Sequence, residues 1–304
     1  MLQQGQPIPG ARFVDPQILA RIGNLDLLAR TVVDGFINGL HRAPYFGASI
    51  DFAEHRGYVP GDDIRRVDWR LYARTDRFYV KQYEADTNTN FCVLLDVSKS
   101  MGFGSRGVTK LEYACFLAAC LAYLAHRQRD RVGIITFDND IVSHVPPSAK
   151  HFNVMLHTLA KATPQRPGQL TEPLNKLAEH FKRRSVLVLI SDFYEDPDAV
   201  LDSIKPLRFL GNELIAFHVL DPAEIQFDYT DASSFEDLES GEQLPIVPES
   251  FGDEYRKLIA QHVNALSTKF SEHRIDYTLM NTSEPLDRAL FSYLSSREKL
   301  MRVR

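Results

Sequence analysis

The chain of 304 residues is 44% hydrophobic and 25% charged, with a net charge of −5. This is an ordinary globular composition, long enough for one large domain or two modest ones around a substantial core. The longest strongly apolar stretch, residues 111–125, includes Glu112 and is shorter than the roughly 20 residues that cross a bilayer. These features argue against a membrane span, and we interpret the stretch as a buried helix.

The N-terminal residues show neither the basic region nor the apolar region of an export signal, so we expect a cytoplasmic protein. The cysteines agree with that expectation. Cys92 falls in an apolar run, and Cys115 and Cys120 lie five residues apart, which is not a metal-ligand spacing. We expect all three to be buried, inert thiols.

Residues 1–40 are predicted to form helices. Asp15-Pro16 indicates a helix start, because Asp caps a helix and Pro fits its first turn. Gly23-Asn24 indicates the end of this helix and the cap of a second one. We expect the second helix to reach Gly35 or Gly39.

From residue 91 to residue 298, apolar runs alternate with amphipathic helical stretches. This alternation predicts an α/β domain with a doubly wound, mainly parallel sheet. A two-residue connection between 132–137 and 140–145 permits only an antiparallel hairpin at one edge. The predicted strands are 91–95, 132–137, 140–145, 186–190, 213–219 and 275–280, and the predicted helices lie near 109–129, 150–161, 172–182, 196–207, 250–272 and 284–296.

A carboxylate and two hydroxyls directly follow the first apolar run of this domain. The sequence there is Asp96-Val97-Ser98-Lys99-Ser100. These side chains offer the hard oxygen ligands that Mg²⁺ accepts, and the hydroxyls add no charge. Asp and Ser are also common turn and capping residues, so the motif by itself favours an ordinary turn.

Two later segments favour the metal interpretation. Asp192 ends the apolar run 186–190, so a second carboxylate is expected at the carboxyl end of a central strand. Ligands of open α/β sheets bind at that edge. Thr171, just before an amphipathic stretch, offers a further hydroxyl from a loop.

The Asp-x-Ser-x-Ser motif at 96–100, the later Thr171 and Asp192, and the antiparallel hairpin resemble the metal-ion-dependent adhesion site of von Willebrand factor A-type domains. Upstream, the sequence YVPGDDIRRVDW at 58–69, followed by Tyr-Ala-Arg at 72–74, resembles the signature of the bacterial family called domain of unknown function 58. The likeness covers about residues 15–298.

The resemblance implies that Asp96, Ser98 and Ser100 supply the first loop of a metal site, Thr171 the second and Asp192 the third. The ion would be Mg²⁺ or another divalent cation, bound directly or through water. Mg²⁺ prefers six oxygen ligands and keeps several waters, so a position would stay open for a partner's Asp or Glu.

The second loop departs from the pattern of the resembled domains. Their second loop usually reads Gly-Gly-Thr, whereas this chain has Gly168-Gln169-Leu170-Thr171. Thr163 is a poorer substitute, because it precedes Pro164 and lies farther from the next helix.

Residues 41–90 are interpreted as an accessory β region, with a strand-like piece at 77–83. Its charged residues and the only tryptophan would form an internal charge network or a docking surface. The docking surface would include Arg65, Arg66, Trp69 and Arg74. Residues 51–90 hold eight acidic and seven basic residues, so we expect no nucleic-acid binding.

Residues 221–254 hold 11 acidic residues and no Lys or Arg. Such a segment is either a solvated connection or an electrostatic surface. As a surface, it would select a basic partner or fold back onto the Arg-rich segment of the same chain.

The main enzymatic alternative is an Mg²⁺-dependent aspartyl-phosphate phosphatase of the haloacid dehalogenase type. Asp96 would be the nucleophile, Thr136 the Ser/Thr after a second strand, and Asp192 and Asp196 the acidic metal ligands. That chemistry needs an acidic group two residues after the nucleophile, where this chain has Ser98, a poor general acid.

We therefore expect a non-enzymatic interaction module that binds partners through a divalent ion. Members of the resembled family often accompany MoxR-type AAA+ ATPases. The resemblance thus implies an adaptor or co-chaperone that presents client proteins to such an ATPase during protein assembly or maturation.

Overall fold

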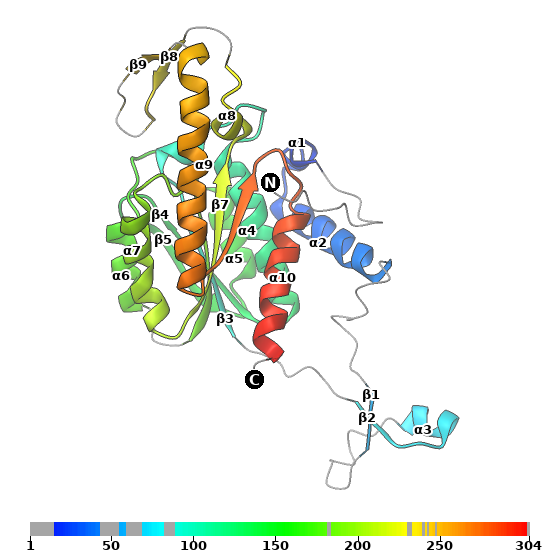
Figure 1. Cartoon of the computed structure of the whole chain (residues 1–304). Helices are drawn as coiled ribbons and strands as arrows, with labels where there is room; N and C mark the ends of the chain where they lie inside the picture. The colour runs from blue at the N-terminus through cyan, green and yellow to red at the C-terminus, as the bar shows by residue number, and fades with distance from the viewer. Residues whose placement is uncertain are drawn as a thin grey trace.

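The computed structural model describes residues 15–42, 55–58, 69–81, 89–180, 184–229, 233–238, 241, 243–246 and 248–302. Its centre is a six-stranded sheet with the strand order β10-β7-β6-β3-β4-β5 (Figure 1). The strands are β3 (Asn90–Asp96), β4 (Arg131–Phe137), β5 (Ile141–Ser148), β6 (Ser185–Ser191), β7 (Glu213–Leu220) and β10 (Asp276–Asn281).

All neighbouring strands of this sheet are parallel except β4 and β5, which form an antiparallel pair at one edge. The predicted fold class is therefore confirmed. The short turn after β4 allows no crossover, so β5 must run against its neighbour. Because β3 and β6 are central, their carboxyl ends lie side by side at one edge of the sheet.

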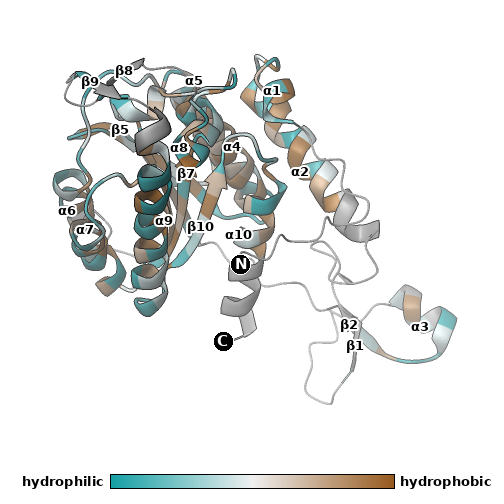
Figure 2. Ribbon diagram, turned by 45° about the horizontal axis from the view of Figure 1, so that its top comes forward, coloured by the Kyte–Doolittle hydropathy of each residue, from teal (hydrophilic) through white to brown (hydrophobic). Residues whose placement is uncertain are grey.

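Helices cover both faces of the sheet, and the strands supply apolar side chains to both (Figures 1 and 2). Along β3, Val93 and Leu95 pack on one face, whereas Cys92 and Leu94 pack on the other. A strand buried on both faces is continuously apolar, which explains the runs in the sequence. One face carries α4 (Lys110–Arg127), α5 (Phe152–Ala160) and α10 (Asp287–Arg302), and the other carries α6 (Thr171–His180), α7 (Pro197–Phe209) and α9 (Pro248–Glu272).

Helix α4 is the buried helix predicted from the apolar stretch. A capping box fixes its first turn, in which Thr109 Oγ1 accepts the backbone N–H of Glu112 at 3.1 Å and the Glu112 carboxylate accepts the N–H of Thr109 at 2.8 Å. Within the described residues, no helix combines the length and the apolar character needed to span a membrane. Cys92, Cys115 and Cys120 are buried free thiols, as predicted.

Two N-terminal helices, α1 (Pro16–Leu19) and α2 (Leu25–Arg42), begin at the predicted caps Asp15 and Asn24. The predicted end of the second helix at Gly35 or Gly39 is wrong, because α2 continues to Arg42. A glycine inside a helix costs only about 1 kcal/mol. The packing of α2 against α4, with Val33 and Phe36 buried, offsets that cost.

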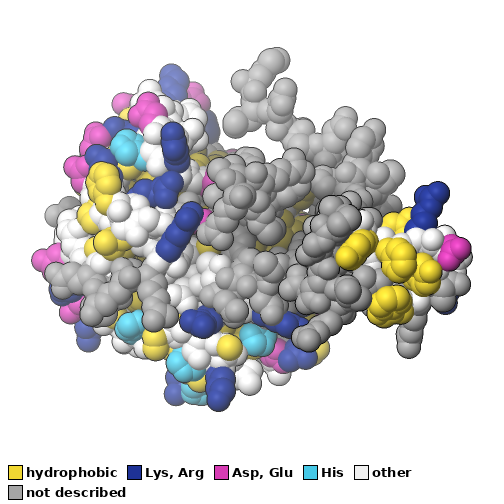
Figure 3. All heavy atoms as spheres, turned by 90° about the horizontal axis from the view of Figure 1, so that it is seen from below, with side chains coloured by type: hydrophobic (Ala, Val, Ile, Leu, Met, Phe, Trp, Pro, Cys, Tyr) yellow, Lys and Arg dark blue, Asp and Glu magenta, His cyan; other side chains and the backbone are white. Residues whose placement is uncertain are grey.

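The accessory region contains α3 (Trp69–Thr75) and a two-stranded antiparallel sheet of β1 (His55–Gly57) and β2 (Tyr79–Lys81). Its aromatic rings contact one another, with Tyr72 and Phe78 stacked at 4.4 Å between centroids. Trp69 and Phe78 remain 55% and 47% exposed, and apolar side chains gather on this part of the surface (Figure 3).

The acidic segment is partly folded into the domain. It includes α8 (Pro222–Gln226) and an antiparallel hairpin of β8 (Ser233–Glu236) and β9 (Gln243–Ile246). Asp221, at the cap of α8, is fully buried, and its carboxylate accepts the backbone N–H of Ser105 at 2.9 Å. This carboxylate is therefore inside the protein. Both interpretations of the acidic segment, as a solvated connection or as a charged surface, would place it in solvent.

Candidate metal centre

Asp96 is the last residue of β3 and its carboxylate is held from two sides. Its Oδ1 accepts the backbone N–H of Ser98 at 2.9 Å, and its Oδ2 accepts the hydroxyl of Ser191 at 2.6 Å. Asp96 and Ser98 are both buried. Ser98 Oγ lies 3.1 Å from the hydroxyl of Ser100, which is part of a short 3₁₀ turn, η2 (Lys99–Gly102). The first loop thus gathers a carboxylate and two hydroxyls.

Asp192 follows β6 and is also buried. The next residue, Phe193, adopts the left-handed conformation with φ of 46°, which is unfavourable for a bulky side chain. Burial of its ring beside Phe270 and a hydrogen bond from His262 Nε2 to its carbonyl, at 2.7 Å, hold this conformation. Such strain is common at functional sites, and Phe193 directly follows the candidate ligand Asp192.

The two carboxylates are close enough to influence each other. Burial, followed by the negative charge of Asp192, raises the pKa of Asp96 to about 7. A bound cation would relieve the repulsion between the two groups. The electrostatics of this sheet edge therefore favour a positive charge beside Asp96.

A positive charge is already present beside the other carboxylate, that of Asp192. Lys110 Nζ lies 2.7 Å from Asp192 Oδ2 and 2.8 Å from Glu224 Oε1, and its side chain is fully buried. Burial lowers the pKa of Lys110, but the two carboxylates outweigh burial and raise that pKa above its ordinary value. The sequence reasoning missed Lys110. A lysine at the start of an otherwise apolar helix was the available signal, because a positive charge is unfavourable at a helix N-terminus.

The second loop contacts the first loop at Gly168. A Cβ at Gly168 would lie 2.3 Å from the Cβ of Ser98, so only glycine fits against this serine without a shift. The carbonyl of Arg166 also accepts the backbone N–H of Lys99 at 2.8 Å. These two contacts dock the 162–170 loop onto the first loop.

Thr171 is the first residue of α6 and is exposed to solvent. Its hydroxyl accepts a hydrogen bond from Ser203 Oγ of α7 at 3.1 Å. The hydroxyl of Thr163 accepts one from Gln165 at 2.9 Å. Both hydroxyls therefore have partners within their own surroundings, and it is Gly168 that the structure brings against Ser98.

The donor set fits Mg²⁺. Asp96 and Asp192 supply carboxylate oxygens, and Ser98 and Ser100 supply hydroxyls, all of which are hard ligands. In the parts of the chain that the structure describes, no group of three or more His, Cys, Asp or Glu side chains is placed to hold a metal. An ion at this edge would therefore rely on the hydroxyls and on water, which suits Mg²⁺ because it keeps several waters.

The remaining predicted residues lie elsewhere. Trp69 and Arg74 are exposed on α3 of the accessory region, whereas Arg65 and Arg66 fall outside the described residues. Of the residues required by the phosphatase alternative, Thr136 is buried inside β4. Asp196 caps α7, with its carboxylate accepting the N–H of Asp198 at 2.9 Å.

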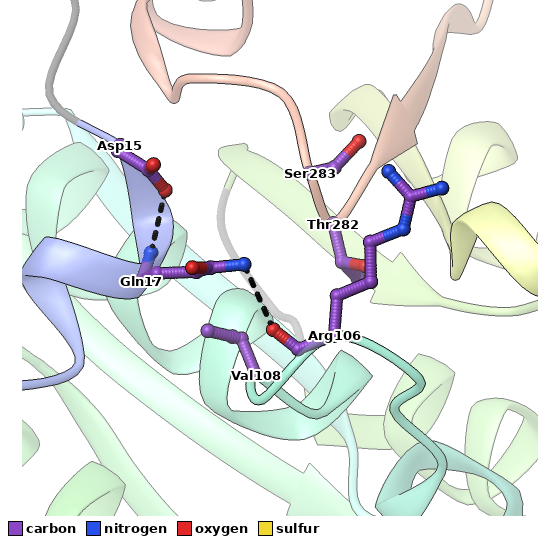
Figure 4. Close-up of a pocket in the computed structure, with 6 residues that line it drawn as sticks. All are labelled: Asp15, Gln17, Arg106, Val108, Thr282 and Ser283. Carbon is purple, nitrogen blue, oxygen red and sulfur yellow. Dashed lines mark hydrogen bonds between the residues drawn. The ribbon is translucent and has the colours of Figure 1, made fainter.

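A small pocket of about 220 Å³ lies between α1 and the loops that follow η2 and β10 (Figure 4). Gln17 Nε2 donates to the carbonyl of Arg106 at 3.0 Å across it. Its residues are Asp15, Gln17, Arg106, Val108, Thr282 and Ser283. None of these belongs to the predicted metal centre.

Solved structures with a similar fold include BatB from Bacteroides thetaiotaomicron, at 16% identity and a TM-score of 0.47, covering 69% of this chain and 99% of that one. An aerotolerance-related membrane protein from Bacteroides fragilis has 16% identity and a TM-score of 0.48, covering 66% and 96%. The Rpn10 VWA domain has 13% identity and a TM-score of 0.42, covering 66% and 93%.

Sequence relatives include uncharacterized proteins of Mycobacterium tuberculosis and Mycobacterium bovis. Each is 30% identical over 258 residues, which is 82% of this chain and 80% of the relative. The sequence profile of the family described as protein of unknown function DUF58 matches residues 54–265. The match includes the signature at 58–74 and the residues of all three loops, and the chain therefore belongs to the DUF58 family.

Proposed function

We propose that this protein is a non-enzymatic interaction module that binds protein partners through a divalent ion held at the carboxyl edge of its sheet. The observation that supports this function is the meeting of Asp96, Asp192 and the two serine hydroxyls at the ends of β3 and β6. These oxygens come from segments almost 100 residues apart, and the ends of adjacent parallel strands bring them together.

The chemistry of the donor set favours partner binding. Two serine hydroxyls are neutral, so an ion held by them and by few carboxylates keeps much of its positive charge. Such an ion can exchange a water for an Asp or Glu carboxylate of another protein. A side chain placed for proton transfer two residues after Asp96 would favour phosphate chemistry, but that position holds Ser98.

We further propose that the partner is a MoxR-type AAA+ ATPase and that the module presents client proteins to it in the cytoplasm. The basis is the family to which the chain belongs, together with the interaction chemistry of the metal centre. The accessory region, with exposed Trp69 and Arg74, offers a second surface for such an assembly.

Metal binding is the first test. Calorimetric titration of Mg²⁺ into the protein should show one site, and Asp96→Ala should abolish it, because the substitution removes the carboxylate of the first loop. Asp140→Ala is the matched control, since Asp140 is exposed and pairs with Lys176 on the surface. Equal Mg²⁺ binding by the wild type and Asp96→Ala would refute the proposed centre.

A further inference from the structure

The position of Lys110 is unfavourable for its charge on two counts. It is the first residue of α4, where the helix dipole disfavours a cation, and its side chain is fully buried, which costs an ammonium group its hydration. The capping box formed by Thr109 and Glu112 is complete without Lys110. The compensation comes from distant segments.

Three groups surround the Lys110 ammonium. The carboxylates of Asp192, from the third loop, and Glu224, from α8, lie 2.7 and 2.8 Å away. The ring of Tyr194 lies 4.7 Å away, within range of a cation–π contact. Lys110 thus joins the third loop of the metal centre to the start of the acidic segment.

The two carboxylates of the centre are compensated differently. Asp192 has an ammonium in direct contact, whereas Asp96 accepts hydrogen bonds from the neutral groups Ser98 N–H and Ser191 O–H. The charge of Asp192 is therefore partly balanced before any metal arrives, because Asp192 shares the ammonium with Glu224. Asp96, in contrast, has no cation among these hydrogen-bond partners.

We propose that Lys110 is the residue that sets the affinity of this centre, acting as an internal cation that partly neutralises Asp192 and keeps divalent-ion binding weak and reversible. The inference rests on the proposed metal centre. Glu224 acts in the opposite sense, because it shares the ammonium with Asp192. When Glu224 is neutral, the full charge of Lys110 falls on Asp192.

The test compares Mg²⁺ dissociation constants of the wild type, Lys110→Met and Glu224→Gln by calorimetry at pH 7.5. Removing a positive charge in contact with a ligand should tighten Mg²⁺ binding in Lys110→Met by at least about tenfold. Glu224→Gln should weaken binding, also by about tenfold, while its amide oxygen can still accept the N–H of Asp221. Lys176→Met, which removes an exposed lysine that pairs with Asp140, should leave the constant unchanged.

Opposite changes in the two variants distinguish this role from a purely structural one, because loss of structure would weaken binding in both. Equal constants in all four proteins would overturn the inference and leave the metal centre intact. No binding by the wild type but clear binding by Lys110→Met would refute the proposed function and support the internal cation. No binding by either would refute both.

Lys110→Met leaves Asp192 and Glu224 buried without their cation, so its melting temperature should fall and should recover with Mg²⁺ by more than that of the wild type. Where this variant does not fold, the double variant Lys110→Met/Glu224→Gln removes the excess charge. The double variant should bind Mg²⁺ more tightly than Glu224→Gln alone. Tighter binding by Glu224→Gln than by the wild type would contradict the inference.

Discussion

At the residue scale, Asp96 combines a fixed geometry with an unusual affinity for protons. Its two oxygens are held by Ser98 and Ser191, and burial together with Asp192 raises its pKa to about 7. In the metal-free protein, a carboxyl pKa raised above its unfolded value stabilises the fold at low pH. That contribution is lost as the pH rises through about 7.

A metal bound at Asp96 would compete with this proton, which gives a prediction for the pH dependence of Mg²⁺ affinity. Mg²⁺ affinity should rise about tenfold per pH unit below pH 7, because one proton leaves Asp96 for each ion bound, and should level off above it. Calorimetry at pH 5.5, 6.5 and 7.5 would measure this dependence. An affinity that stayed constant over this range would show that Asp96 does not exchange a proton for the metal.

At the element scale, the candidate metal centre is formed by loops that are held in place by contacts with distant parts of the chain. The second loop approaches the first so closely that Gly168 contacts the side chain of Ser98 directly. The third loop takes its shape from Phe193, which α9 holds through His262. Each loop depends on a neighbour from a distant part of the chain, so local changes should affect the centre as a whole.

Gly168→Ala tests the contact between the first and the second loop. An added Cβ at 2.3 Å from Ser98 Cβ forces the loops apart, so the free energy of unfolding should fall by about 1–3 kcal/mol and Mg²⁺ binding should weaken. Urea denaturation and calorimetry would measure the two effects. Gly35→Ala is the control, because its new Cβ meets nothing within 4 Å and a helical alanine should raise stability by about 0.5–1 kcal/mol.

An unchanged stability and an unchanged Mg²⁺ affinity in Gly168→Ala would contradict the contact. The outcome also bears on Thr171, whose hydroxyl accepts a hydrogen bond from Ser203. Thr171 stays a predicted ligand, and its alanine variant can be titrated in the same series.

At the scale of the whole molecule, two surfaces of the described residues are candidates for partner contacts. One is the sheet edge with the metal centre, and the other is the accessory region, where Trp69 is 55% exposed. The two candidate contacts differ in chemistry, because only the first would depend on a divalent ion.

Capture of a cognate MoxR-type ATPase by the immobilised protein should therefore weaken in EDTA and in Asp96→Ala, because both remove the ion that a partner's carboxylate would bind. Asp140→Ala should capture as much ATPase as the wild type. An interaction indifferent to EDTA but lost in Trp69→Ala would instead assign the contact to the accessory region.

The sequence predicted the fold and the strand ends at which Asp96 and Asp192 lie. Continuous apolar runs indicate strands buried on both faces, so the sheet, its antiparallel edge and the placement of Asp96 and Asp192 at strand ends followed from local pattern. The long helix α4 followed in the same way. The end of α2 could not be predicted in this way, because the packing of α2 against α4 outweighs the weak tendency of glycine to end a helix.

The sequence by itself thus determined the elements and the sheet edge at which Asp96 and Asp192 lie. Only the tertiary structure decided the contacts among them. The Lys110–Asp192 pair joins residues 82 positions apart, and Gly168 meets Ser98 across a similar gap. The spacing of apolar residues along the sequence indicates which face of a helix or strand is buried. The partner of a buried charge depends instead on how distant loops pack together.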